Sequence, residues 1–257
     1  MISVRNIHKS FGGIHAVDDC SIEVKRGTIT GLIGPNGAGK TTLFTIITGF
    51  IKPDAGQVLL EDRDITGLKP HQLFDRGLVR TFQIPHEFNG LTSLENLMVV
   101  PAAQDGENLL KAWFMPGAVA QREAEVLVQA EETLAFLGLE QVRDVLAGNL
   151  SGGQKKLVEL GRAMMSGAQM ILLDEPGAGV NPTLLNQLGE KIQRLNSERG
   201  ITFCIIEHNM DMIARLCDPV IVMASGTVLT SGVMEDIRKD ERVLEAYLGS
   251  SETGDPA

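Results

Sequence analysis

The chain has 257 residues, which is near the upper limit for a single hydrophobic core. Hydrophobic residues make up 43% and charged residues 22%, a balance that favours a globular α/β protein and excludes a disordered or fibrous chain. The formal net charge of -10 excludes a uniformly basic surface for nucleic acid or anionic lipid, so any bound phosphate must be held by local groups.

The first third of the sequence predicts three short strands, at residues 2–8, 21–25 and 28–33. The pairs Gly12-Gly13 and Arg26-Gly27 are typical of turns between them. This pattern indicates a small sheet that leads into a core strand of a parallel sheet.

A glycine-rich loop follows the third predicted strand and precedes a predicted helix that ends at Gly49. Residues 34–41 fit the pattern G-x-x-x-x-G-K-[ST]. In such a loop, backbone N–H groups converge on phosphate oxygens, and the helix N-terminus adds partial positive charge. We expect Lys40 to reach the β and γ phosphates of a nucleotide and Thr41 to offer its hydroxyl to Mg²⁺. The alternative is a glycine-rich turn without function.

Between residues 87 and 145 the β-branched runs give way to helix-forming residues. A helix is predicted over 121–137, where apolar residues share one face. We interpret this region as an inserted helical lobe. Within it, residues 101–117 contain Gly and Pro that interrupt a helix, and we expect the only tryptophan, Trp113, to pack there.

From residue 151 the pattern returns to alternating helices and strands. The predicted helices are 151–166, 182–199 and 209–216, and the predicted strands are 169–174, 201–206, 219–224 and 227–231. Such alternation implies parallel βαβ units with right-handed crossovers. The α/β stretches on both sides of the helical lobe are expected to form one sheet, and residues 250–257 a disordered tail.

The predicted strand 169–174 is apolar and ends in two carboxylates, Asp174 and Glu175. A buried parallel strand would present both at its C-terminal edge, beside the phosphate loop. We expect Asp174 to hold Mg²⁺ through water, and Glu175 to orient and polarise the attacking water. The alternative is a pair of acids that caps a strand.

The segment Leu150–Gln154 reads LSGGQ and opens a predicted helix. Ser151 is a suitable N-cap, and Gly152 and Gly153 expose backbone donors. The segment therefore predicts a second anion site. A Ser-Gly-Gly turn alone is weak evidence, but its position between the phosphate loop and the acidic strand strengthens it.

The cysteines and the apolar runs give expectations about location. The cysteines are widely spaced without a CxxC or Cys/His metal pattern, so we expect reduced, packed thiols in a cytosolic protein. The three are Cys20, Cys204 and Cys217. No signal peptide is evident, and no apolar run approaches the roughly 18 residues of a spanning helix. If the protein serves a membrane, other chains must cross it.

The phosphate loop, LSGGQ and the acidic strand resemble the nucleotide-binding domain of ABC transporters over residues 2–249. The resemblance implies an α/β fold: a P-loop NTPase (RecA-like) core with an N-terminal antiparallel β subdomain and an inserted α-helical subdomain. It implies one domain over 1–249, with 1–86 and about 155–249 as the α/β core lobe and about 87–154 as the helical subdomain with the signature. In that family the signature of one subunit caps the ATP held by the phosphate loop of another. The implied active unit is a head-to-tail pair.

The resemblance also implies roles outside these motifs. Phe11 matches the aromatic residue that stacks on adenine, and core packing is its alternative. Gln83 matches the glutamine that contacts Mg²⁺ and communicates with membrane subunits, with a polar strand end as its alternative. His208 matches the switch histidine that touches the γ-phosphate, although a lone histidine is usually structural. Where the family has an aspartate that contacts the partner, this chain has Asn181, which is able to cap a helix beginning at Pro182.

The predicted site therefore binds ATP and Mg²⁺. The expected catalytic residues are Lys40, Glu175 and His208. The expected ATP-binding residues are Phe11, Gly34, Pro35, Asn36, Gly37, Ala38, Gly39, Lys40, Thr41, Thr42, Gln83, Ser151, Gly152, Gly153 and Gln154. The expected metal ligands are Thr41, Gln83 and Asp174.

Four details make the chain similar to the ATPases of branched-chain amino-acid importers and their relatives for urea and short amides. They are RTFQ at 80–83, the insert 101–122, the segment 175–182 and EAYLG at 245–249. The resemblance implies a second ATPase subunit, integral membrane permease subunits and, indirectly, a periplasmic solute-binding protein, with no nucleic acid. It implies a peripheral location on the cytoplasmic face of the inner (plasma) membrane.

Three other functions stay open from the sequence. An ATPase of lipopolysaccharide export shares the Ala-Gly-Val and Tyr-Leu-Gly features but lacks an insert of this length. A non-transport ABC ATPase acting on ribosomes or in DNA repair usually fuses two such domains or carries a long coiled coil. A P-loop small-molecule kinase would leave LSGGQ and His208 without a purpose.

Overall fold

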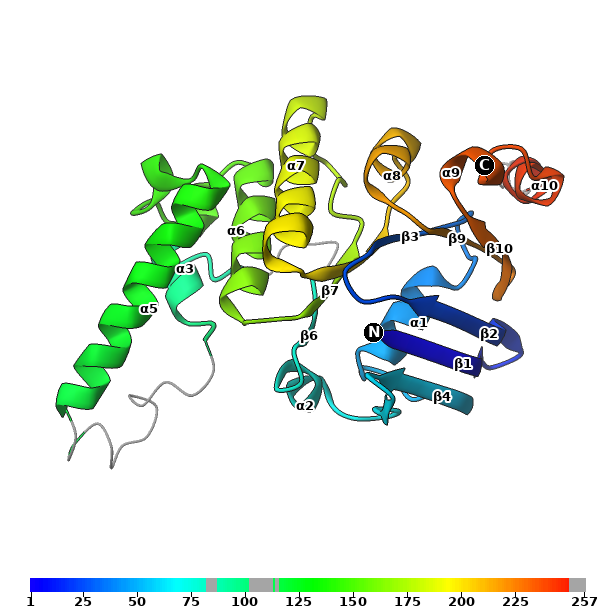
Figure 1. The fold of residues 1–257 in the computed structure, drawn as a ribbon, viewed down its shortest axis with the longest axis horizontal. Helices are drawn as coiled ribbons and strands as arrows, with labels where there is room; N and C mark the ends of the chain where they lie inside the picture. Colours follow the sequence, from blue (N-terminus) through cyan, green and yellow to red (C-terminus); the bar gives the residue numbers. More distant parts are fainter. Residues whose placement is uncertain (82–86, 102–112, 114–115, 250–257) are drawn as a thin grey trace.

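The computed structural model describes residues 1–81, 87–101, 113 and 116–249, and in these residues the strands form two sheets (Figure 1). The first sheet is antiparallel, in the order β2 (Ile14–Val24), β1 (Ile2–Phe11), β4 (Ala55–Leu60) and β5 (Arg63–Asp64). The second has the order β10 (Thr227–Gly232), β9 (Val220–Ala224), β3 (Ile29–Ile33), β8 (Thr202–Ile206), β7 (Met170–Asp174) and β6 (Leu78–Arg80). Its pairs are parallel except β9 with β10. The predicted α/β fold class is confirmed.

The central strands of the second sheet are buried on both faces, as expected for continuous apolar runs in a parallel sheet. Successive side chains point to opposite faces, so each strand contributes to two cores. Ile171 and Leu173 of β7 join the core under the helices, whereas Met170 and Leu172 join the core shared with the first sheet. The sheet therefore separates two apolar layers.

Helices cover the two faces of this sheet differently (Figure 1). On one side lie α6 (Gly152–Met165), α7 (Pro182–Arg199) and α8 (Met210–Leu216), and on the other α1 (Lys40–Ile47) and the first sheet. The remaining helices are α2 (Pro70–Phe74), α3 (Ser93–Met98), α5 (Pro116–Leu137), α9 (Met234–Ile237) and α10 (Glu241–Gly249), with single 3₁₀ turns at Glu140–Val142 and Ala147–Asn149.

The helical lobe is packed onto α6. Side chains of α5 at helical spacing, including Ala130, Leu134 and Leu137, are buried in the same core as Leu97 of α3. A methyl group on Gly161 of α6 would lie 2.8 Å from Leu137 Cδ1, so the helices meet closely at this glycine. None of the helices in the described ranges is long and apolar enough to cross a membrane.

Several elements differ from the sequence prediction. β2 begins at Ile14 rather than at residue 21, because its pairing with β1 continues across register shifts through a segment containing Asp18 and Asp19, residue types that are rare in strands. β4 was not predicted. Trp113, expected to pack, is 83% exposed. The boundary of the helical subdomain near residue 155 stays a prediction, and α6 runs continuously through it. The tail 250–257 lies outside the described residues.

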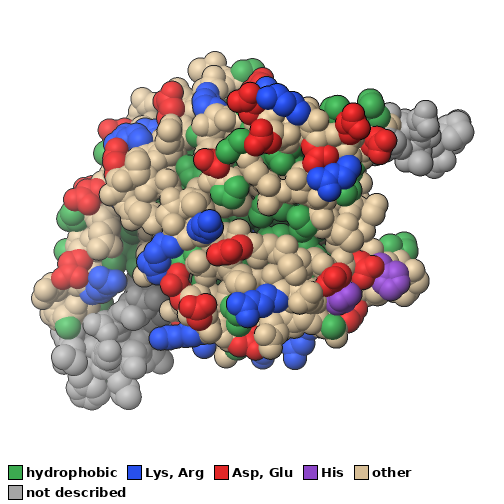
Figure 2. All heavy atoms as spheres, turned by 45° about the vertical axis from the view of Figure 1, so that its right-hand side comes forward, with side chains coloured by type: hydrophobic (Ala, Val, Ile, Leu, Met, Phe, Trp, Pro, Cys, Tyr) green, Lys and Arg blue, Asp and Glu red, His purple; other side chains and the backbone are tan. Residues whose placement is uncertain are grey.

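The surface mixes charges of both signs. On the face drawn in Figure 2, acidic and basic side chains alternate without one large patch of either sign. The net charge of -10 is therefore not gathered into one acidic patch on this face.

Candidate active site

The predicted phosphate loop connects β3 to α1. Gly34 has φ of +150° and Gly39 has φ of +96°. A Cβ atom at these positions would lie 2.0 Å from Met223 O and 2.3 Å from Ala16 O. Only glycine fits such positions, so the path of the loop depends on these two residues.

Lys40 begins α1 and folds back over the loop. Its Nζ donates hydrogen bonds to Gly34 O at 2.7 Å and Pro35 O at 2.9 Å, and the residue is 5% exposed. Burial lowers the pKa of the Lys40 ammonium, and the charges of Glu175 and Asp174 oppose this shift. The ammonium is thus held between the loop and the acidic end of β7.

The other loop residues differ in accessibility. Asn36, Gly37 and Thr41 are exposed, Pro35 and Thr42 are half-buried, and Ala38 is buried in the core shared with the first sheet. The exposed backbone of the loop is available to a ligand.

Asp174 ends β7 and is paired with an arginine that the sequence analysis did not count among the site residues. Arg80 Nη2 donates to Asp174 Oδ2 at 2.6 Å, and Arg80 Nη1 donates to Thr45 Oγ1 at 3.1 Å. The Thr45 hydroxyl donates in turn to the carbonyl of Thr41. Arg80 therefore ties the acidic strand to the first turns of α1. Its place as the first residue of RTFQ was the only available signal.

Glu175 follows β7 in a strained conformation, with φ of +49°. Left-handed backbone at a residue other than glycine is uncommon and clusters at functional sites. The backbone N–H of Glu175 donates to Ile206 O at 2.9 Å, which anchors it beside β8. Its Oε1 lies 3.0 Å from His208 Nε2. The structure thus brings together Lys40, Asp174, Glu175 and His208 from three separate segments.

The LSGGQ segment starts α6 as predicted. The Ser151 hydroxyl accepts from Gln154 N at 3.3 Å, and Gln154 Oε1 accepts from Ser151 N at 2.9 Å, so the two residues form a capping box. Space is open at Gly152, whereas a methyl group at Gly153 would lie 1.4 Å from Leu184 Cδ2 of α7. Gly153 is therefore required for the packing of two helices as well as being a possible donor.

The signature lines a cavity to which the phosphate loop contributes no residue. Ser151 and Gln154 line a cavity of about 510 Å³ together with Asn181 and Leu184. Its lining contains no residue of the segment 34–42. Asn181 accepts a hydrogen bond from Leu184 N at 2.9 Å and caps α7. Within one chain, this cavity therefore does not join the two predicted anion sites.

Two residues carried over from the family pattern have different outcomes. Phe11 ends β1 with 50% of its surface exposed and Lys9 Nζ 5.6 Å from its ring centroid. Core packing is excluded for this side chain, and its ring is accessible for stacking. Gln83 lies outside the described residues.

The oxygen donors fit a hydrated Mg²⁺ ion. Mg²⁺ keeps several waters and usually takes one or two protein ligands together with substrate phosphates. The Thr41 hydroxyl is exposed at the loop, and Asp174 is close enough to Lys40 to interact with it electrostatically. In the described ranges no group of three or more His, Cys, Asp or Glu side chains is arranged to hold a metal ion, so a metal there would depend on phosphate oxygens and water.

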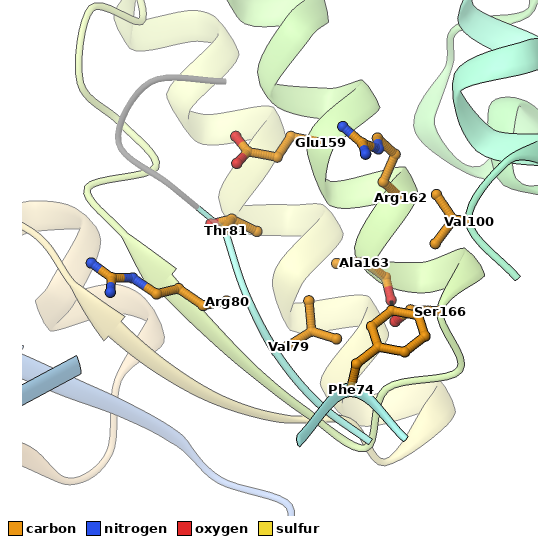
Figure 3. Close-up of a pocket in the computed structure, with 9 residues that line it drawn as sticks. All are labelled: Phe74, Val79, Arg80, Thr81, Val100, Glu159, Arg162, Ala163 and Ser166. Carbon is orange, nitrogen blue, oxygen red and sulfur yellow. Dashed lines mark hydrogen bonds between the residues drawn. The ribbon is translucent and has the colours of Figure 1, made fainter. Parts of the chain in front are cut away.

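A groove of about 170 Å³ runs between β6 and α6. Figure 3 shows Glu159 and Arg162 of α6 toward one end and Phe74 of α2 toward the other, while Arg80 points away from α6. Burial lowers the pKa of the Arg162 guanidinium, opposed by the charges of Glu159 and Glu87. Arg162 also lies 5.0 Å from the centroid of the Phe88 ring. The groove is mainly apolar with a charged end.

Comparisons with known proteins agree with this geometry. The family model described as "ABC transporter" matches residues 17–178, and the model described as "Branched-chain amino acid ATP-binding cassette transporter" matches residues 227–253. The probable branched-chain amino acid transport ATP-binding protein LivG of Methanocaldococcus jannaschii is 42% identical, with 97% of each chain covered. Its counterpart in Archaeoglobus fulgidus is 40% identical, covering 98% of this chain and 97% of that one.

Two solved structures are informative. An ATP-binding cassette of an ABC transporter in its ADP conformation is 39% identical, with a TM-score of 0.82, covering 97% of this chain and 98% of that one. A dimeric bacterial ABC transporter cassette is 26% identical, with a TM-score of 0.74, covering 91% of this chain and 99% of that one. The match extends over nearly the entire fold.

Proposed function

The chain belongs to the ABC transporter family of ATP-binding subunits, and on this premise we propose that it hydrolyses ATP to energise an importer of branched-chain amino acids or related small solutes. The observation that carries the hydrolytic part is the pair formed by Glu175 and His208, 3.0 Å apart and close to Lys40. The solute class is supported by the names of relatives that match nearly the full chain.

In the proposed reaction the protein aligns the attacking water with the γ-phosphate and neutralises phosphate charge, because phosphoryl transfer to water needs little covalent participation of the protein. The loop N–H groups and Lys40 bind the β and γ phosphates, and Lys40 exchanges its bonds to Gly34 O and Pro35 O for phosphate oxygens. Thr41, Asp174 and Gln83 would hold Mg²⁺ together with water, and the ion would supply neutralisation of the phosphate charge. Glu175 orients the attacking water and accepts its hydrogen bond, while His208 contacts the γ-phosphate. The water oxygen bonds to the γ-phosphorus as its proton passes to the Glu175 carboxylate, and the bond between the γ-phosphorus and the bridging oxygen breaks, so that ADP leaves with that oxygen.

A second ATPase subunit completes each site in this proposal. Ser151 and Gln154 line a cavity that contains no residue of the phosphate loop of their own chain, which supports the availability of the segment 151–154 to the nucleotide of a partner. A similar cassette has been solved as a dimer. ATP would then favour association of the subunits and hydrolysis would release them, since ATP binds the associated state more tightly.

We place the membrane permease subunits at the groove between β6 and α6 (Figure 3). The groove adjoins the end of β6, where the chain leads toward Gln83, and it combines apolar walls with the charges of Glu159 and Arg162. An amphipathic helix of the permease would match both features. The chain would then act peripherally at the cytoplasmic face of the plasma membrane, with a periplasmic solute-binding protein on the other side.

The substitution Glu175→Gln tests the proposal. We expect ATP binding to persist and phosphate release to fall by roughly 10²–10⁴, the range for loss of a positioned base. We also expect this variant to migrate as a larger species with ATP and Mg²⁺ than with ADP in size-exclusion chromatography. The exposed residue Glu190 on α7 provides the control Glu190→Gln. Unchanged phosphate release in Glu175→Gln would reject the role of Glu175, and phosphate transfer to a metabolite would favour a kinase.

A further inference from the structure

A buried carboxylate joins the two loops that carry Glu175 and His208. Glu207 lies between β8 and α8 and is 4% exposed. Its Oε1 accepts a hydrogen bond from Gly177 N at 2.6 Å. Its Oε2 accepts from His208 N at 2.7 Å and from Asn209 N at 3.1 Å. One side chain therefore holds the backbone of both loops.

The chemistry of this contact requires a carboxylate. Three N–H donors converge on Glu207, and an ionised carboxylate offers acceptor sites on both of its oxygens. The amide of glutamine has one acceptor oxygen, so its NH₂ group would face N–H donors of one loop. Hydrogen bonds to an ionised group are stronger than neutral ones, and a buried donor left unpaired is costly.

The segment held by Glu207 leads from Glu175 to the N-cap of α7. Ala178 N donates to Glu175 O at 3.1 Å and Val180 N donates to Gly177 O at 3.1 Å, so the segment consists of two successive turns that end at Asn181. Gly177 is anchored between Glu175 and Asn181. A displacement at Asn181 would therefore be transmitted through Gly177 to Glu207.

We propose that Glu207 is a positioning residue. It fixes the positions of Glu175 and His208 relative to each other and couples both to the segment 175–181. This inference rests on the proposed hydrolysis at Glu175 and His208. Glu207 acts through backbone N–H groups and does not need to touch the nucleotide.

Hydrogen exchange on the full-length chain tests the coupling without ATP hydrolysis. In Glu207→Gln we expect amide exchange in both 175–181 and 207–210 to rise by about 10-fold to 100-fold, the range for loss of a charge-assisted hydrogen bond. In Glu207→Asp, the shorter side chain can still accept from Asn209 N in a local turn, so exchange should rise mainly in 175–181. The control Glu190→Gln, on exposed α7, should leave both segments unchanged.

Kinetics test the consequence for the reaction. We expect Glu207→Gln to lower kcat by about 10-fold to 100-fold while KM for ATP changes by less than about twofold. In a His208→Ala background the same substitution should lower kcat by less than about a further twofold, because the effects of residues that act as a unit are not additive. A uniform rise in exchange across the chain, or an unchanged kcat in Glu207→Gln, would overturn the proposal. A wild-type chain that does not hydrolyse ATP would reject the proposed function alone, since exchange still decides whether Glu207 couples the loops.

Discussion

Replacing Arg80 with alanine is expected to lower the free energy of unfolding by about 3–5 kcal/mol, the cost of breaking a buried ion pair by removing one partner. The side chains of Arg80 and Asp174 are 7% and 5% exposed, and Nη2 and Oδ2 are 2.6 Å apart. Loss of the guanidinium would leave the largely buried Asp174 carboxylate without its ion-pair partner. The substitution also removes the charge-assisted hydrogen bond to Thr45, and bonds of this kind contribute about 1.5–3 kcal/mol.

Two further variants separate these contributions. Thr45→Val removes the hydroxyl that accepts from Arg80 Nη1 and donates to Thr41 O. It keeps the ion pair with Asp174 and should cost about 1.5–3 kcal/mol, the range for a hydrogen bond to a charged group. Arg80→Ala combined with Asp174→Asn removes both charges, so the double variant should be more stable than Arg80→Ala alone. The measurement is urea unfolding followed by circular dichroism, with a second probe to check that the transition is two-state. A loss below about 1 kcal/mol in Arg80→Ala, or no recovery in the double variant, would refute the reasoning.

Three other predictions concern separate parts of the chain. Burial raises the pKa of the Cys20 and Cys217 thiols to about 12 and raises the pKa of the Cys204 thiol further. Above pH 9.0 the thiols ionise only in the unfolded chain, so the free energy of unfolding should fall as the pH rises. Between pH 8 and pH 10, urea unfolding should show a total loss of about 1.4 kcal/mol for each thiol, and no loss would contradict the prediction. Gly153→Ala should lower the free energy of unfolding by about 1–3 kcal/mol because Leu184 must move, whereas Gly152→Ala, in open space, should leave it unchanged. Equal changes of Tm in the two variants would contradict this prediction. Phe11→Ala should weaken binding of a fluorescent ATP analogue by about 5-fold to 100-fold with little change in Tm. An unchanged affinity would show that the Phe11 ring does not stack on the base.

The sequence alone was sufficient for the features whose chemistry is local. The phosphate loop, the LSGGQ cap and the acidic end of β7 each consist of consecutive residues, so their conformation follows from glycine freedom, capping and strand burial. The βαβ alternation after residue 151 likewise predicted the parallel sheet, with element boundaries that agree within a residue or two. The bounds of irregular strands were harder to predict, because the register shifts between β1 and β2 near Asp18 and Asp19 depend on how the two strands pair.

Contacts between distant segments were decided only by the tertiary structure. Arg80 meets Asp174 across 94 positions in sequence, and Glu207 meets Gly177 across 30. Neither pair has a local signal, because a polar side chain at the end of a strand finds its partner only when neighbouring strands pack in parallel and bring their carboxyl ends to one edge. The sequence thus predicted which groups would handle phosphate. The order of β6, β7 and β8 decided which side chains hold those groups in place.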